Sequence, residues 1–284
     1  MRDAAFQGLA VGFFDGVHLG HQAILKGADA ALTFRNHPLT VLAPEKAPRL
    51  IMSVEDRIAA IKACGVGEVT VLDFTPELAE MSAAEFLTRY LASSVSRLPS
   101  SVRCGENWRF GKGGVGDAAF LRERGLAVEV VPYAEYKGET VSSSRIRRCL
   151  ENGEIEDANA MLGRRYEVRG KREEGKGLGR QIGYPTVNLQ LSTSTSSPRL
   201  PLGVYEVEVE GRKAIANYGL APTMGDKAWR EPTMEIHFLH CPPPPLFPTS
   251  VNVGLLRFIR KEMNFDSIED LKRQIAADCA TITA

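Results

Sequence analysis

The first half of the chain alternates short apolar segments with amphipathic ones. The apolar segments have the length of buried strands, and apolar residues recur at helical spacing in the segments between them. The expected strands are Leu9–Phe14, Ala31–Phe34, Val69–Phe74, Val102–Cys104 and Val128–Pro132. The expected helices are Gln22–Lys26, Val54–Ala63, Ala83–Leu91, Ala118–Arg124, Ser142–Leu150 and Ile155–Met161. This order predicts an α/β, Rossmann-like domain with a parallel sheet and helices on its faces.

After Gly163 the pattern changes to short segments in which apolar and polar residues often alternate, separated by Gly, Pro and Ser. The expected strands are Tyr166–Arg169, Val187–Leu191, Gly203–Glu210, Ala214–Asn217, Thr233–Leu239 and Val251–Phe258. Such alternation is typical of an all-β antiparallel barrel or sandwich. A C-terminal helix is expected at Ile268–Ala277. We therefore predict two domains, residues 1–163 and 164–284, the second of them a barrel.

Composition and charge exclude several classes of protein. The chain has 35 Lys and Arg residues against 35 Asp and Glu residues. Proteins of duplex nucleic acid usually carry a basic excess, so no nucleic acid partner is expected, although a local basic cleft stays open. The five cysteines form no C-x-x-C pair, so neither a disulfide framework nor a zinc site is expected. Without an export signal or an apolar stretch of about 18 residues, we expect a cytoplasmic protein with no membrane partner.

The densest motif is the segment Gly12–His21, GFFDGVHLGH, which follows the first expected strand and opens the first expected helix. In an open parallel sheet, ligands bind at the carboxyl ends of the strands. The helix start offers unpaired N–H groups to a phosphate, and glycines let the backbone come close. His18 and His21 can donate hydrogen bonds to a polyphosphate as charge builds on it. The alternative is two polar histidines on a turn, which the preceding strand and Asp15–Gly16 disfavour.

This segment resembles the nucleotidyltransferase half of the bacterial bifunctional riboflavin kinase/FMN adenylyltransferases, also called FAD synthetases. Three more segments are similar to that family: Thr33–Pro38, Gly105–Gly111 and Val141–Arg147. In the last, hydroxyls and an arginine at a helix start can bind a leaving pyrophosphate, which is compatible with a simple N-cap. The catalytic residues expected in this half are His18, His21 and Arg145. The expected ATP- and flavin-binding residues are Gly12, Phe14, Asp15, Gly16, His37, Asn107, Ser142 and Ser143.

A second motif, GKGLGRQIGYPTVN at Gly175–Asn188, precedes a strand in the barrel half. As a glycine-rich loop alone it favours a plain hairpin, since no strand–loop–helix context surrounds it. Its ending resembles the G-x-P-T-A-N of riboflavin kinases, where Thr and Asn help to hold Mg²⁺ beside the ATP phosphates. That role carries over to Thr186 and Asn188, whose oxygen atoms suit Mg²⁺. The ATP- and flavin-binding residues expected here are Gly175, Gly177, Gly179, Arg180 and Gly183.

Two later segments, Asn217–Gly225 and Glu231–His237, also match the kinase family. The resemblance implies that Glu235 is the base that takes the proton from the ribityl hydroxyl of riboflavin. From spacing alone, a solvent-facing glutamate on a strand would be the stronger interpretation. His237 lies on the same face and is interpreted as structural.

The resemblance covers nearly the whole chain and implies two ATP-dependent reactions: riboflavin to FMN, then FMN to FAD with release of pyrophosphate. Leu178, Val187 and the Pro242–Pro245 run depart from the family pattern. The segment from His21 to Thr33 is also short, so we expect the strand to be kept and the first helix to have at most two turns. Two alternatives stay open: a riboflavin kinase with an impaired adenylyltransferase half, and a flavin-binding module without activity.

Overall fold

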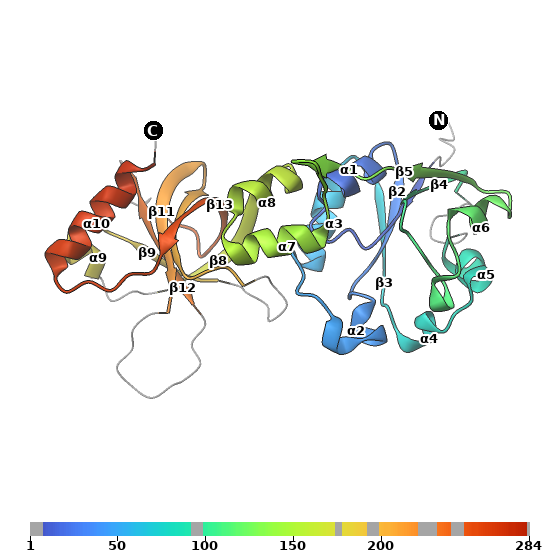
Figure 1. Cartoon of the computed structure of the whole chain (residues 1–284), viewed down its shortest axis with the longest axis horizontal. Helices are drawn as coiled ribbons and strands as arrows, with labels where there is room; N and C mark the ends of the chain where they lie inside the picture. Colours follow the sequence, from blue (N-terminus) through green and yellow to red (C-terminus); the bar gives the residue numbers. More distant parts are fainter. Residues whose placement is uncertain are drawn as a thin grey trace. The chain divides into compact units, whose positions relative to one another are not determined.

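A computed structural model describes residues 8–91, 99–173, 178–191, 199–220, 232–239 and 247–282. Its internal contacts divide the chain into two compact units, residues 1–145 and 146–284 (Figure 1). The division lies earlier than the boundary expected at Gly163. None of the helices in the described ranges is long and apolar enough to cross a membrane.

The first unit is built on a five-stranded sheet in the order β3-β2-β1-β4-β5, and every pair in it is parallel. Its strands are β1 Leu9–Val11, β2 Ala30–Phe34, β3 Glu68–Leu72, β4 Ser101–Gly105 and β5 Ala127–Val131. The chain runs outward from β1 to β3 and then crosses to β4, on the other side of β1. The strand order therefore reverses between β1 and β4, and ligands of such sheets bind at the carboxyl ends beside this point.

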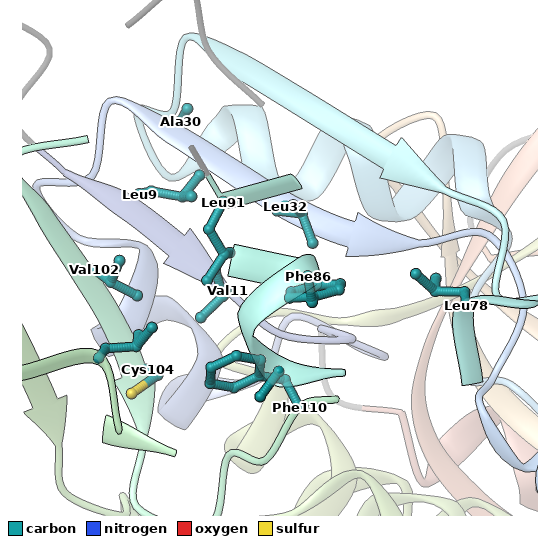
Figure 2. Close-up of a cluster of buried hydrophobic side chains, with 12 residues drawn as sticks. Leu9, Val11, Ala30, Leu32, Leu78, Phe86, Leu91, Val102, Cys104 and Phe110 are labelled. Atoms are coloured by element: carbon teal, nitrogen blue, oxygen red, sulfur yellow. The ribbon is translucent and has the colours of Figure 1, made fainter. Parts of the chain in front are cut away.

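Helices cover both faces of the sheet, as the alternation of strands and helices predicted. Its described helices are α1 Leu19–Leu25, α2 Leu39–Leu42, α3 Val54–Ala63, α4 Pro76–Ala79, α5 Ala83–Phe86 and α6 Ala118–Arg122. Leu9 and Val11 point to one face and pack with Phe86 and Phe110 (Figure 2). Ala10 points to the opposite face and packs in a cluster with residues of α1 and α3. Single-turn elements complete the unit at Pro44–Lys46, Leu87–Leu91 and Lys112–Gly114.

The short crossover after β1 forms as the sequence predicted. Helix α1 has seven residues, about two turns, and β2 still pairs in parallel with β1, with Leu9 opposite Ala30. Two other expectations were wrong. β1 ends at Val11 rather than at Phe14, because the φ of Phe14 is +57° and the chain turns away. β3 was expected to be buried, but it lies at the sheet edge and is half-buried.

The second unit contains a closed antiparallel barrel in the order β10-β11-β12-β9-β8-β13, which confirms a barrel. Its strands are β8 Tyr166–Glu173, β9 Val187–Leu191, β10 Gly203–Val209, β11 Arg212–Gly219, β12 Thr233–Phe238 and β13 Ser250–Lys261. The expected C-terminal helix is present as α10, Ile268–Ala280. A four-residue helix, α9 Leu178–Gln181, was not expected. The Pro242–Pro245 run lies outside the described residues.

The two helices expected before the barrel are α7, Ser143–Asn152, and α8, Ile155–Leu162. Helix α8 lies against β13 and β8. The side-chain Nδ2 of Asn159 donates to the Leu255 carbonyl at 2.8 Å, and its Oδ1 accepts the Tyr166 N–H at 2.7 Å. These contacts explain why α8 falls within the barrel unit, whereas the change of pattern in the sequence occurs only after it.

Candidate active sites

The loop after β1 turns sharply before α1 begins. Phe14, Gly16 and Val17 have φ values of +57°, +84° and +40°. Glycine adopts such angles freely, but each non-glycine residue there costs about 1–3 kcal/mol, and such strain clusters at functional sites. A Cβ on Gly12 would lie 2.9 Å from the Phe14 ring, so a side chain there would displace that ring. The strain is concentrated at the carboxyl end of the central strand, where the sequence predicted a phosphate site.

His18 and His21 lie against each other at the start of α1. Their rings stack with centroids 3.6 Å apart, and the rings of Phe14 and His21 form a T-shaped pair with centroids 5.4 Å apart. His18 is the N-cap, and its Nδ1 accepts the His21 N–H at 3.4 Å. A neutral His18 therefore carries its hydrogen on Nε2. A Cβ on Gly20 would lie 3.3 Å from the His18 ring, so glycine leaves room for the histidine pair.

The start of α7 is bound to the β1 loop. Ser143 Oγ donates to the Asp15 carbonyl at 2.9 Å, and Ser142 Oγ accepts the Arg145 N–H at 3.2 Å, as an N-cap does. The Asp15 carboxylate is buried and accepts the Ile51 N–H at 2.9 and 3.2 Å. Its backbone thus joins α7 to the loop, while its side chain fixes the segment that leads into α3.

Arg145 is held by a hairpin that the sequence did not predict, made of β6 Glu135–Tyr136 and β7 Glu139–Thr140. Its Nη1 donates to the carbonyls of Tyr136 and Glu139 at 2.9 and 3.0 Å. Its Nε lies 3.3 Å from the Glu139 carboxylate. The guanidinium therefore remains next to the start of α7, but several of its donors hold the hairpin.

His37 and Asn107 come from the loops after β2 and β4. His37 Nδ1 accepts the Leu39 N–H at 3.1 Å, and its ring packs edge-on against Phe13 of the β1 loop at 4.8 Å. Asn107 is exposed, and its Oδ1 lies beside Gly105 at the end of β4. The structure therefore connects His37 to the β1 loop, whereas no described contact links Asn107 to the histidines.

In the barrel, Asn188, Glu235 and Asn217 occupy directly paired positions on three neighbouring strands, β9, β12 and β11. Directly opposite residues of antiparallel strands share a face, with Cβ atoms about 4.5–5.5 Å apart. The residues that alternate with them, such as Leu189 and Met234, are fully buried, so the row lies on the outer face of the barrel. Thr186 immediately precedes β9, at one end of this row.

The turn containing α9 packs onto Thr186. Tyr184 N–H donates to the Gly179 carbonyl at 2.8 Å. A Cβ on Gly179 would collide with the Tyr184 carbonyl and lie 3.0 Å from Thr186 Oγ1, so only glycine fits. Gly183 has a φ of +89° and Arg180 is exposed, while Gly175 and Gly177 lie outside the described residues. The segment between β8 and β9 thus contains a helical turn, which the sequence did not predict.

Two ionisable residues of β12 bear on the chemistry of the row: Glu235 within it and His237 beside it. The pKa of the Glu235 carboxyl is raised above its ordinary value, because the surrounding protein partly removes it from water although the residue keeps an exposed surface. A raised pKa makes a carboxylate a better proton acceptor. His237 Nδ1 is hydrogen-bonded to the Pro185 carbonyl at 3.0 Å, and its ring meets Tyr184 at 5.3 Å. It holds the backbone that leads into Thr186, in agreement with the structural role expected for it.

Comparison with known proteins matches both halves. Residues 3–145 match the FAD synthetase family, and residues 162–284 match the riboflavin kinase family. A bifunctional riboflavin kinase/FMN adenylyltransferase of Bacillus subtilis is 32% identical, over 95% of this chain and 89% of that protein. Its counterpart in Pseudomonas fluorescens is 33% identical, over 96% of this chain and 91% of that protein. The chain belongs to the bifunctional riboflavin kinase/FMN adenylyltransferase family.

Membership of this family decides between the open alternatives. Both a FAD synthetase domain and a riboflavin kinase domain are present, so the chain is a kinase and a nucleotidyltransferase of FAD biosynthesis. The short crossover does not remove the adenylyltransferase half, because its central β1–α1–β2 unit is complete. A solved structure described as a macrolide-efflux protein from Streptococcus pneumoniae has a TM-score of 0.83 at 28% identity. It covers 97% of this chain and 93% of that one, which supports the two-part fold.

The donors of the kinase half fit a magnesium ion. Thr186 offers a hydroxyl and Asn188 an amide oxygen, and Mg²⁺ prefers oxygen ligands. Within the described ranges, no group of three or more His, Cys, Asp or Glu residues could hold a metal ion. Cys64, Cys104, Cys149 and Cys279 are free there, and the fifth cysteine, Cys241, lies outside the described residues.

Sequence reasoning missed one residue beside the Gly12–His21 loop. Arg57 of α3 is fully buried and donates to backbone carbonyls at the ends of β1 and β2. A signal was present, because Arg57 lies one helical turn before Ile61, on the face that α3 buries. An arginine on that face has to find partners inside the protein.

Proposed function

We propose that FMN adenylylation takes place at the Gly12–His21 loop and that riboflavin phosphorylation takes place at the row of Asn188, Glu235 and Asn217. The observation that supports the first assignment is the stacked His18–His21 pair at the start of α1, beside the point where the strand order reverses. The observation that supports the second is the direct pairing of Asn188 with Glu235.

In the adenylyl transfer, an oxygen of the FMN phosphate attacks the α-phosphorus of ATP, and the bond to pyrophosphate breaks. No protein nucleophile is needed, so the protein contributes positioning and charge stabilisation. His18 and His21 donate to the phosphate oxygens, and Arg145 places its positive charge at the start of α7. The loop residues Gly12, Phe14, Asp15 and Gly16, together with Ser142 and Ser143, shape the ATP site. His37 and Asn107 border it from the neighbouring strand ends.

In the kinase reaction, Glu235 accepts the proton of the ribityl hydroxyl, whose oxygen attacks the γ-phosphorus of ATP and releases ADP. Thr186 and Asn188 would hold Mg²⁺, which neutralises phosphate charge when it is bound. The ATP phosphates are bound by the glycine-rich segment. Its proposed ligands are Gly175, Gly177, Gly179, Arg180 and Gly183.

Product analysis tests both assignments. The enzyme is incubated with riboflavin, ATP and Mg²⁺, and FMN and FAD are separated by chromatography. His21→Ala should stop FAD formation and leave FMN formation intact, since removal of one donor costs about 10²–10³-fold in rate. Glu235→Gln should stop FMN formation from riboflavin and leave FAD formation from supplied FMN intact. A folded variant that loses both activities in parallel would disprove the division between the two sites.

The small-molecule substrates riboflavin, FMN and ATP are the only partners in this proposal, and the enzyme works in the cytoplasm, where ATP is available. The balanced charge of 35 basic and 35 acidic residues supports a partner set without nucleic acid. The domains that carry the two activities are residues 1–163 and 164–284, although α8 contacts the barrel.

A further inference from the structure

Arg57 is a buried charge that the proposed mechanism does not use. Helix α3 begins after Ser53, whose side chain accepts the Asp56 N–H, and this cap fixes the register that turns Arg57 and Ile61 inward. Both residues have no exposed surface. Arginine is almost never fully buried unless it is paired, so its partners indicate what it does.

The guanidinium joins the carboxyl ends of two neighbouring strands. Its Nη1 donates to the Phe13 carbonyl in the loop after β1, at 3.1 Å. Its Nη2 donates to the carbonyl of Phe34, at the end of β2, at 2.6 Å, and to the carbonyl of Arg35 at 3.2 Å. Thr33 Oγ1 donates to the same Phe13 carbonyl at 2.9 Å. The Phe13 carbonyl therefore accepts two hydrogen bonds, one from Arg57 and one from Thr33.

The same side chain also contacts the aromatic ring of Phe13 in the loop after β1. The Arg57 guanidinium lies 4.3 Å from the centre of the Phe13 ring, a cation–π contact, and Phe13 meets His37 edge-on at 4.8 Å. The next residue is Phe14, whose ring meets His21. A displacement of Phe13 would therefore be passed on to both His37 and His21.

Stability alone does not account for an arginine at this position. Burial lowers the pKa of Arg57, and the carboxylates of Asp15 and Glu55 oppose that effect. Within the described part of the chain, its Nε has no hydrogen-bond partner. Even a complete buried ion pair can often be replaced by apolar residues of similar volume without loss of stability, so a buried charge is weak evidence for a stabilising role. Burial of Arg57 costs desolvation free energy and leaves its Nε unpaired among the described residues. We therefore look for the role of Arg57 in its contacts with the loop after β1.

We propose that Arg57 is a positioning residue for adenylyl transfer: it fixes the carboxyl ends of β1 and β2 and, through Phe13, the loop and histidines that bind the phosphates of ATP. This inference rests on the proposed function, which assigns adenylylation to that loop. The guanidinium acts through the backbone and through Phe13. It also places a fixed positive charge behind the proposed phosphate site.

The test compares Arg57→Met with Arg57→Lys in the full chain. Methionine keeps an unbranched apolar stem and removes the charge and the donors, whereas lysine keeps the charge and one donor group. The kcat and the KM for ATP are measured for FAD formation from FMN. We expect kcat to fall about 10²-fold in Arg57→Met, the cost of slight misplacement of reacting groups. KM should change much less, and lysine should restore part of the lost rate.

Arg103→Lys and Arg103→Met are the matched control. Arg103 also donates to two backbone carbonyls, those of Ile24 at 2.9 Å and Ala23 at 3.3 Å, but these lie toward the C-terminal end of α1, away from the loop. Both control variants should keep the kcat of the unchanged enzyme. Riboflavin kinase activity, measured on the same samples, is the internal standard for the amount of active chain.

Folding of the variants is checked by thermal unfolding. If Arg57→Met shows no cooperative transition, Arg57→Lys decides, with an expected fall in kcat of about tenfold at nearly constant KM. The inference is overturned by a folded Arg57→Met with unchanged kcat, by a change in KM alone, or by an equal loss in the Arg103 variants. In the fallback case, unchanged kcat in Arg57→Lys overturns it as well. FAD formation that survives His21→Ala refutes the assigned site itself, whereas loss in His21→Ala without loss in Arg57→Met refutes the inference alone.

Discussion

Asn159→Ala should weaken the barrel unit specifically. The Asn159 amide donates to Leu255 of β13 and accepts from Tyr166 of β8, at 2.8 and 2.7 Å. Alanine would leave both backbone groups unpaired in a partly buried position, and each such group costs about 1–3 kcal/mol. We therefore expect the free energy of unfolding of this unit to fall by about 2–4 kcal/mol. For a unit of this size, that corresponds to a melting temperature lower by roughly 6–15 °C.

The two activities of the chain make the assay specific to each unit. Residual riboflavin kinase activity and residual FMN adenylyltransferase activity are measured after exposure to increasing temperature. Only the kinase midpoint should move in Asn159→Ala. Asn152→Ala is the control, because Asn152 donates to Glu154 at 3.3 Å on the exposed surface, and such changes usually stay within about 0.5 kcal/mol.

The reasoning is refuted if Asn159→Ala and Asn152→Ala have the same kinase midpoint, or if only the adenylyltransferase midpoint moves. Truncation extends the test to the domain boundary. Residues 146–284 should fold with kinase activity, because they retain α8. Residues 164–284 should melt at a lower temperature, since Leu255 and Tyr166 lose the side chain that pairs them. Equal melting temperatures would show that the barrel does not need α8.

Three more predictions concern the kinase half. Because the pKa of Glu235 is raised, kcat for FMN formation should fall as the pH drops through that raised pKa, beginning at a higher pH than for an ordinary glutamate. If Glu235→Gln shows the same pH dependence of kcat as the unchanged enzyme, the base assignment is contradicted. Thr186→Ala should lower kinase activity by weakening Mg²⁺ binding. Extra Mg²⁺ should partly restore the activity of Thr186→Ala but not that of Glu235→Gln. Equal restoration in the two variants would make Glu235 a metal ligand or a positioning group. Gly179→Ala should reduce kinase activity at least tenfold, since its Cβ would collide with the Tyr184 carbonyl. FAD formation from FMN is the control for this variant. An unchanged kinase rate would show that the turn can shift to accommodate the alanine Cβ without loss of kinase activity, which would contradict the prediction.

The sequence by itself determined the class of each half and the location of the main motif. Alternating strands and helices required a parallel sheet, because parallel neighbours need crossovers. The segment from His21 to Thr33 is only about twelve residues long, which limited α1 to about two turns. In the structure, α1 has seven residues. The GFFDGVHLGH segment follows β1, so its place at the carboxyl end of a strand was already set. These features depend on residues close together in the chain.

Tertiary structure alone decided which distant residues meet. The row of Asn188, Glu235 and Asn217 depends on the register of three strands, and a one-residue slip would turn Glu235 to the other face. The carbonyls that hold Arg57 also come from remote segments, 22 to 44 residues away along the chain. Local pattern fixes which face of a helix or strand is buried. Which donors and acceptors are paired there is fixed only when the elements pack, because every buried polar group must find its partner in the space that packing leaves.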